Sequence, residues 1–291
     1  MMHKGGYMRS KVSMLVFLAF LCAGVSTMYT QRLVRKPVSE KQQVQMRHGD
    51  DSQQAVLDGA SDAVWRKTMQ GYRAFQKKYP VGSRFMKSLA EGQSPEIMVV
   101  GCVDSRVDMA ILLGARPGTL FTERNVANIV PPFQKDQCRH GTGAALEYGI
   151  DKRFLNVKHL IIVGHSKCGG IKALLTGLDN KKNTFIMPWV SQTKAALETL
   201  PEAKRTESPM SDDTVDECAK AALKESYKHC LEYPFIAERV KDGSLIIHVW
   251  FFDIGKGMIY MWAKDKEDKP WEPIDEKTLN RFLESKRARV Q

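Results

Sequence analysis

The sequence GCVDSR at 101–106 follows the apolar run IMVV at 97–100, and GHSKCGG at 164–170 follows LIIV at 160–163. Each apolar run is long enough for a buried strand, and the glycine after it marks where the strand ends. Two thiols, an imidazole, a carboxylate and a guanidinium thus lie at the ends of two predicted strands. Because the carboxyl ends of parallel strands meet at one edge of a sheet, the two motifs are predicted to build one site.

The rest of the chain indicates an α/β fold with a mostly parallel central sheet flanked by helices. Predicted strands at 96–102, 119–125 and 157–164 alternate with segments of helical periodicity. Strands and helices that alternate at this spacing are typical of parallel strands joined by crossover helices. At 244–265 the pattern alternates and turns at 255–257, which predicts an antiparallel hairpin at the sheet edge near the C-terminus.

Residues 1–31 have the pattern of a signal-like or anchor segment, because Lys4, Arg9 and Lys11 precede an apolar run. The run of about 14 residues is short for a membrane span but suits a signal-peptide core. We expect export or a membrane tether through 12–29. An unused extension on a cytoplasmic protein and an organelle presequence are the alternatives. Residues 32–60 are predicted to be a polar linker, and 61–291 a single domain that holds the site.

The net charge of +11 does not indicate a nucleic-acid partner. Residues 1–50 carry eight Lys and Arg against two acidic residues, so more than half of the excess lies there. The sequence has no basic stripe interleaved with aromatic residues, which single-strand binding requires. We therefore expect a protein that binds no nucleic acid.

Cys102, His165 and Cys168 are the side chains that zinc prefers, and catalytic zinc sites keep three protein ligands and one open position. The fourth position is predicted to hold water or Asp104. Arg106 is two residues further on and is expected to hold Asp104 by a paired hydrogen bond, away from the metal. The motifs therefore predict a zinc enzyme.

A purely structural zinc site is the main alternative, and it would need a fourth ligand from Cys138 or His140. A thiol-redox site lacks a second cysteine close to either predicted ligand in the sequence. A phosphate-binding loop lacks the G-K-[ST] ending. Cys218 and Cys230 are expected to be buried free thiols.

The motifs C-x-D-S-R, R-N-V-A-N at 124–128 and G-H-S-x-C-G-G resemble those of the beta-class carbonic anhydrases, in their plant-type subclass. The resemblance runs from about Ser61 to Thr278. It implies one zinc ion per subunit on the three predicted ligands, with Asp104 and Arg106 as the catalytic dyad. It also implies reversible hydration of carbon dioxide to bicarbonate and a proton by zinc-bound hydroxide, in a homodimer or higher homo-oligomer.

The same resemblance implies a set of residues that contact the substrate. Gln93 matches a glutamine that hydrogen-bonds substrate, and Gly169 matches a backbone group beside a metal ligand. Phe121 and Val126 match apolar positions of the carbon dioxide pocket, and Tyr148 matches an aromatic residue near the partner subunit's site. Without the resemblance, Phe121, Val126 and Tyr148 are equally well read as core residues.

Lys167 stands where many relatives have a small residue, and we expect it to be solvated. Two functions from other classes remain open on the sequence. One is a zinc-stabilised binding protein without activity, and the other is a carbon disulfide or carbonyl sulfide hydrolase on the same fold.

Overall fold

The computed structural model describes residues 51–136, 138–177, 185–264, 266 and 270–277. The predicted signal-like or anchor segment at 1–31, with the tether through 12–29, lies outside these residues. Within them, no helix is both long enough and apolar enough to span a membrane. Residues up to Val81 and residues from Gly82 onward form two compact units, and each is described by itself. The extent of the catalytic domain, 61–291, stays a prediction.

In the first unit, helix α3 spans Asp51–Lys78. Residues 51–60 of the predicted linker are therefore helical, and the alanines and the leucine of AVLDGA favour this conformation. The helix exposes large apolar side chains, among them Val64, Trp65 and Tyr72. In the sequence the helical periodicity begins only at Val64, and the polar residues before it show no periodic pattern that would mark the helix start.

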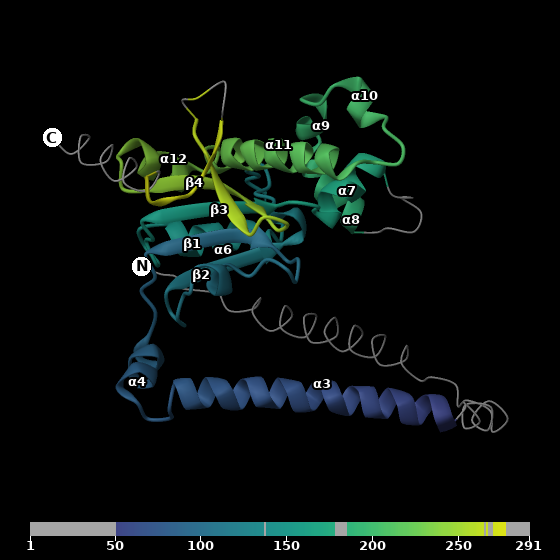
Figure 1. Cartoon of the computed structure of the whole chain (residues 1–291). Coiled ribbons are helices and arrows are strands. Elements are labelled where there is room, and N and C mark those ends of the chain that lie inside the picture. Colours follow the sequence, from purple (N-terminus) through teal and green to yellow (C-terminus); the bar gives the residue numbers. More distant parts are fainter. Residues whose placement is uncertain (1–50, 137, 178–184, 265, 267–269, 278–291) are drawn as a thin grey trace, which may run out of the picture. The chain divides into compact units, whose positions relative to one another are not determined.

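The second unit is built on one six-stranded sheet (Figure 1). Its order is β2-β1-β3-β4-β5-β6, with parallel pairing from β2 to β4 and antiparallel pairing from β4 to β6. The predicted mostly parallel sheet and its C-terminal hairpin are confirmed. The strands are β1 (Ile97–Cys102), β2 (Leu120–Asn125), β3 (His159–His165), β4 (Ile246–Asp253), β5 (Met258–Trp262) and β6 (Trp271–Pro273).

Strand β6 extends the predicted hairpin by one more antiparallel strand. It has three residues and ends in proline, so it is too short to show a period and suits only a sheet edge. The helices of this unit are α4 (Arg84–Glu91), α5 (Met109–Leu112), α6 (Gly141–Ile150), α7 (Gly169–Thr176), α8 (Ile186–Val190), α9 (Ala195–Glu198), α10 (Glu202–Arg205), α11 (Asp212–Cys230) and α12 (Pro234–Lys241), with 3-10 turns η1 (Val126–Asn128) and η2 (Ser191–Thr193).

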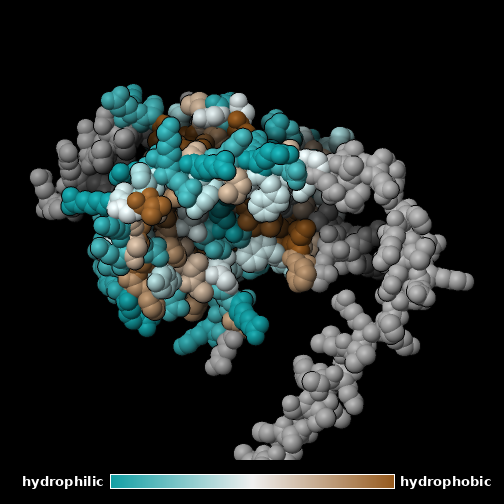
Figure 2. Space-filling model, turned by 90° about the horizontal axis from the view of Figure 1, so that it is seen from below, coloured by the Kyte–Doolittle hydropathy of each residue, from teal (hydrophilic) through white to brown (hydrophobic). Residues whose placement is uncertain are grey.

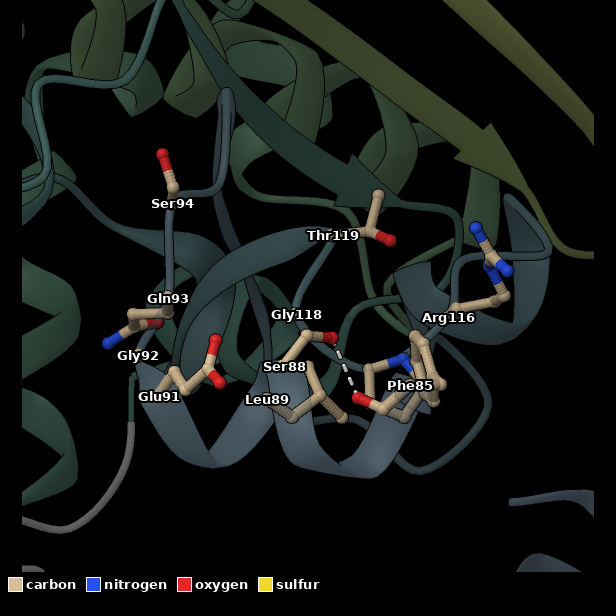
Figure 3. A pocket seen from close by; sticks show the side chains of 11 residues that line it. Phe85, Ser88, Leu89, Glu91, Gly92, Gln93, Ser94, Arg116, Gly118 and Thr119 are labelled. Atoms are coloured by element: carbon tan, nitrogen blue, oxygen red, sulfur yellow. Dashed lines mark hydrogen bonds between the residues drawn. The ribbon is translucent and has the colours of Figure 1, made fainter. Parts of the chain in front are cut away.

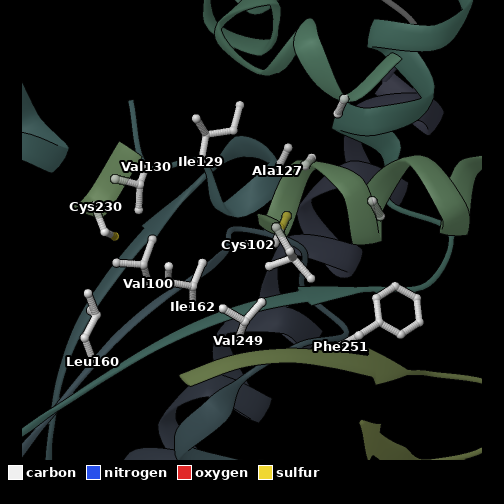
Figure 4. Packing of buried hydrophobic residues seen from close by; sticks show 14 of the residues in the cluster. Val100, Cys102, Ala127, Ile129, Val130, Leu160, Ile162, Cys230, Val249 and Phe251 are labelled. Atoms are coloured by element: carbon white, nitrogen blue, oxygen red, sulfur yellow. The ribbon is translucent and has the colours of Figure 1, made fainter. Parts of the chain in front are cut away.

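The central strands are buried on both faces, as their continuous apolar runs predicted. Alternate residues of β1 contribute to two separate apolar clusters. The larger cluster includes Val100, Ile162 and Cys102, and it also takes in the buried thiols Cys218 and Cys230 of α11 (Figure 4). The end of β1 that carries Cys102 is thus anchored in the main core.

Helix α7 begins beside the turn η1, and two adjacent glycines at its start have opposite surroundings. A Cβ on Gly170 would lie 2.8 Å from Val126 Cγ1 and 3.0 Å from Ala127 Cβ. A Cβ on Gly169 would meet no atom within 4 Å. Gly170 is therefore needed for close packing, and Gly169 is not.

We predict that Gly170→Ala destabilises the metal-free protein by about 1–3 kcal/mol because the added methyl group overpacks this contact. Gly169→Ala, the matched control, should change the stability by no more than about 0.5 kcal/mol because its added methyl group meets no atom within 4 Å. Urea unfolding of both variants measures the two effects. Equal stabilities would contradict the packing argument.

Candidate metal centre

The three predicted ligands come together at one edge of the sheet. Strands β1 and β3 are parallel neighbours, with Gly101 opposite Val163, so Cys102 and His165 end adjacent strands. Cys168 follows at the N-cap position of α7. The ligand atoms of Cys102, His165 and Cys168 all lie within 4.8 Å of one another, and all three residues are buried. In the part of the chain that the structure describes, no other group of His, Cys, Asp or Glu forms such a cluster.

The imidazole of His165 is oriented as a metal ligand requires. Its Nδ1 lies 2.9 Å from the carbonyl oxygen of Ser166, and as the N–H donor it leaves Nε2 unprotonated. Nε2 is buried and has no hydrogen-bond partner, one of two such side-chain atoms among the described residues. A buried nitrogen acceptor without a partner costs free energy, and a metal ion in the cluster would remove that cost. The donor set therefore fits zinc.

The two thiols are joined by a hydrogen bond that favours the thiolate form of Cys102, and a thiolate attracts a cation. Hydrogen bonding from Cys168 is the largest influence on Cys102 and lowers its pKa to about 4. The same bond and burial raise the pKa of Cys168. Burial alone would lower the pKa of His165, but its interaction with Cys102 raises it. A divalent ion in this cluster would replace the shared protons.

Asp104 and Arg106 form the predicted paired hydrogen bond. Asp104 Oδ1 accepts from Arg106 Nε at 2.9 Å, and Oδ2 accepts from Nη2 at 2.7 Å. The backbone N–H of Arg106 donates to Oδ1 at 2.9 Å. These bonds hold the pKa of the Asp104 carboxyl well below its usual range. Asp104 Oδ2 lies 3.8 Å from His165 Nε2, so an ionised carboxylate borders the ligand cluster.

Arg124 braces the loop after Cys102, a role that the sequence motif did not reveal. Its Nε donates to the Cys102 carbonyl at 2.9 Å, and its Nη2 donates to the carbonyls of Asp104 and Val107 at 2.8 and 2.9 Å. Three backbone carbonyls are thus fixed by one guanidinium group. An arginine near the carboxyl end of a predicted strand was the only signal of this contact.

Val126 and Gly169, which the resemblance implies as substrate contacts, lie near the predicted ligands. Gly169 directly follows Cys168 at the first position of α7. Val126 is next to Gly170 in space, and its carbonyl accepts from Trp189 Nε1 at 2.7 Å. Helix α8 therefore packs beside this part of the site.

Phe121 near the start of β2 and Tyr148 of α6 lie together, away from the strand ends that carry the ligands. Their ring centroids are 5.9 Å apart. Phe121 is opposite Met98, whereas the residue opposite Cys102 is Asn125. Four residues of strand correspond to about 13 Å, so this aromatic pair lies away from the ligands of its own subunit.

Gln93 lies in a different pocket of about 530 Å³ (Figure 3). This pocket is lined by α4, the segment before β1 and the turn before β2, and it includes none of the three ligands. Gln93 precedes β1, whose carboxyl end carries Cys102, and six residues of strand span about 20 Å. Within one subunit, Gln93 and the ligands are therefore at opposite ends of β1.

Cys138 and His140 do not join the cluster. Cys138 is an exposed free thiol, and His140 Nε2 lies 2.5 Å from Asp136 Oδ1. The four-ligand structural site is thus not assembled from these residues.

Comparison with known proteins agrees with this geometry. A family model described as carbonic anhydrase matches residues 97–259. From Arabidopsis thaliana, beta carbonic anhydrase 5, chloroplastic, is 37% identical over 69% of this chain and 66% of its own length. Beta carbonic anhydrase 3 of the same plant is 36% identical over 72% of this chain and 80% of its own length.

Crystal structures of two tetrameric beta-carbonic anhydrases from Sordaria macrospora provide a structural match. The TM-score is 0.55 at 31% sequence identity, and the match covers 74% of this chain and 98% of that chain. Sequence and fold agree with the ligand cluster at the carboxyl ends of β1 and β3. This chain belongs to the beta carbonic anhydrase family.

Proposed function

We propose that this protein catalyses the reversible hydration of carbon dioxide to bicarbonate and a proton, with one zinc ion per subunit. The observation that carries the proposal is the buried Cys102–His165–Cys168 cluster, whose unpartnered Nε2 lies beside the Asp104 carboxylate. A zinc ion held by these residues would act as a Lewis acid that generates a nucleophile from water at neutral pH.

Asp104 serves as the hydrogen-bond acceptor at the metal centre. Hydrogen bonds from Arg106 hold the pKa of Asp104 well below its usual range, so the carboxylate stays ionised. It can therefore accept a hydrogen bond from a group near the ligands. Arg106 engages both carboxylate oxygens, which keeps Asp104 in this role and out of the fourth ligand position. The pair would thus orient the reacting water, with the Asp104 carboxylate engaged by Arg106 rather than by a bound metal.

Carbon dioxide is small and apolar, so its binding needs a dry wall and a few polar groups that orient it. Val126 and the backbone of Gly169 supply part of that wall next to the ligands. Gln93 precedes β1, and Phe121 lies near the start of β2 beside Tyr148 of α6, so all three are toward the opposite edge of the sheet from the ligands. For these three residues to contact the substrate, they have to act in the site of a partner subunit.

A homo-oligomer therefore follows from the proposed site. Large apolar side chains reach the surface of the second unit at Ile111, Tyr148 and Phe154, and Figure 2 shows apolar groups among hydrophilic ones on one face. Exposed apolar groups of this kind mark contact surfaces. The Sordaria proteins are described as tetrameric, which supports an assembly of more than one subunit here.

The cellular location rests on residues 1–31, for which the sequence leaves export, a membrane tether, an unused extension and an organelle presequence open. The chloroplastic designation of the Arabidopsis relative supports the presequence among these alternatives. We propose that the segment is a targeting segment.

Purified protein is expected to contain one zinc ion per chain and to hydrate carbon dioxide in a stopped-flow assay. Cys168→Ala should lose zinc and activity together, because two remaining ligands hold the ion poorly. Cys230→Ala removes a buried thiol outside the cluster and is the matched control, which should keep its zinc. Zinc without hydration in the wild type would favour a binding protein, and turnover of carbonyl sulfide instead would favour the hydrolase.

Arg106→Ala is expected to lower the hydration rate about 10–100-fold, because Asp104 loses the partner that fixes its orientation. The pKa of Asp104 should then rise toward its usual value of about 3.9, so the carboxylate stays ionised from about pH 6 to about pH 9 in both proteins. The loss should therefore be the same across this range. A loss that grows toward the acid end would show that Asp104 becomes protonated there.

The two-subunit site can be tested by mixing inactive variants. Gln93→Ala removes the polar contact, and Cys168→Ala removes the metal. In a hybrid of the two, one site combines an intact ligand set with Gln93 of the other subunit, so activity should return after the variants are unfolded and refolded together. Each variant refolded alone is the control. No recovery in hybrids isolated by two affinity tags would place Gln93 in its own subunit's site.

A further inference from the structure

Lys167 connects two metal ligands in an unusual backbone conformation. It lies between His165 and Cys168, and its φ is +56°. A residue with a Cβ adopts this left-handed conformation at a cost in free energy, so surrounding contacts have to maintain it. The direction in which Cys168 leaves the loop depends on this peptide.

Every polar group of Lys167 has a partner. Its backbone N–H donates to Asp216 Oδ1 at 2.6 Å, and its carbonyl accepts from Arg106 Nη2 at 3.2 Å. Its ammonium group lies 2.9 Å from Asp212 Oδ2. The expectation that Lys167 is only solvated is thus incomplete, because it is also tied to the dyad arginine and to α11.

The two acidic partners stand on a rigid support. Asp212 and Asp216 are four residues apart, which puts them on the same side of α11. The helix begins after Ser211, whose side chain accepts from the backbone N–H of Thr214. It packs on β3 and α7, and Val215, next to Asp216, is fully buried in the main core.

The two acidic contacts differ in strength. The side chains of Lys167 and Asp212 are 56% and 55% exposed, and an ion pair so exposed to water contributes little. Asp216 is partly buried, and burial raises its pKa while the N–H of Lys167 acts in the opposite direction. A short hydrogen bond to a carboxylate is among the stronger ones in proteins. Asp216 is therefore the contact that holds the peptide.

We propose that Asp216 is a positioning residue for the metal centre. Its charge-assisted hydrogen bond holds the left-handed Lys167 peptide, which sets the relative direction of His165 and Cys168. Through the Lys167 carbonyl it also aligns Arg106 with Asp104. The proposal deepens the proposed function and rests on it for its link to catalysis, but its effect on metal binding is measurable without turnover.

The test compares Asp216→Ala and Asp216→Asn with the wild type as full-length, metal-reconstituted proteins. Zinc affinity is measured by competition with a chromogenic chelator, and ligand geometry by the visible absorption spectrum of the cobalt(II)-loaded protein. Asp216→Ala should bind zinc about 10–100-fold more weakly, the usual effect of losing a partner that orients ligands. Its cobalt spectrum should differ from that of the wild type.

Asp213→Ala is the matched control, because it removes one acidic residue of the same helix turn without touching Lys167. It should keep wild-type zinc affinity and the wild-type cobalt spectrum. Asp216→Asn retains an oxygen acceptor without the charge, so its affinity should lie between those of the wild type and Asp216→Ala. Circular dichroism shows whether Asp216→Ala folds. If it does not, the zinc affinity of Asp216→Asn is the test, and an affinity equal to that of the wild type overturns the proposal.

Two other results would overturn the proposal. One is an unchanged affinity and cobalt spectrum in a folded Asp216→Ala, and the other is an equal loss in Asp213→Ala, which would indicate a general charge effect. If the wild type binds zinc and cobalt but does not hydrate carbon dioxide, the proposed function fails. The comparison of metal binding between the variants still tests the role of Asp216.

Discussion

The parallel pairing of β1 with β3 is the constraint on which the rest of the site depends. It places Cys102 beside the last residues of β3, so that His165 and Cys168 reach it across one strand spacing. Strand β1 is about 20 Å long, and it separates this edge of the sheet from the residues that precede β1. The same pairing that assembles the metal ligands therefore keeps Gln93 away from them.

At that edge, a few side chains make many hydrogen bonds to the backbone of the loops. Arg124 binds the carbonyls of Cys102, Asp104 and Val107. Ser166 donates its N–H to the carbonyl of Phe252 in β4, and its Oγ accepts from the N–H of Ile254, just after that strand. Backbone groups that leave a strand lose their ladder partners, and side chains replace them here. A rigid donor set follows, which is what a tightly held ion requires.

Prediction agreed with the structure where a chemical type and its position on a strand carried the information. Cysteine and histidine after apolar runs were enough to indicate side chains that cluster at one sheet edge, and Asp104 and Arg106 are close enough in sequence for their pairing to be local. Prediction was incomplete where contacts join distant segments. The contact of Asp216 with Lys167 and the three bonds of Arg124 have no periodic or spacing signature, because they depend on how α11 and β2 pack.

The sequence by itself determined the ligand types, the strand ends that carry them and the mostly parallel sheet, because these follow from side-chain chemistry and local periodicity. Only the tertiary structure decided that His165 has an unpartnered Nε2 and that Lys167 is held in a left-handed conformation. It also separated Phe121 and Tyr148 from the ligands along the strands. These features depend on strand register and helix packing, which bring residues together over distances that no local pattern encodes.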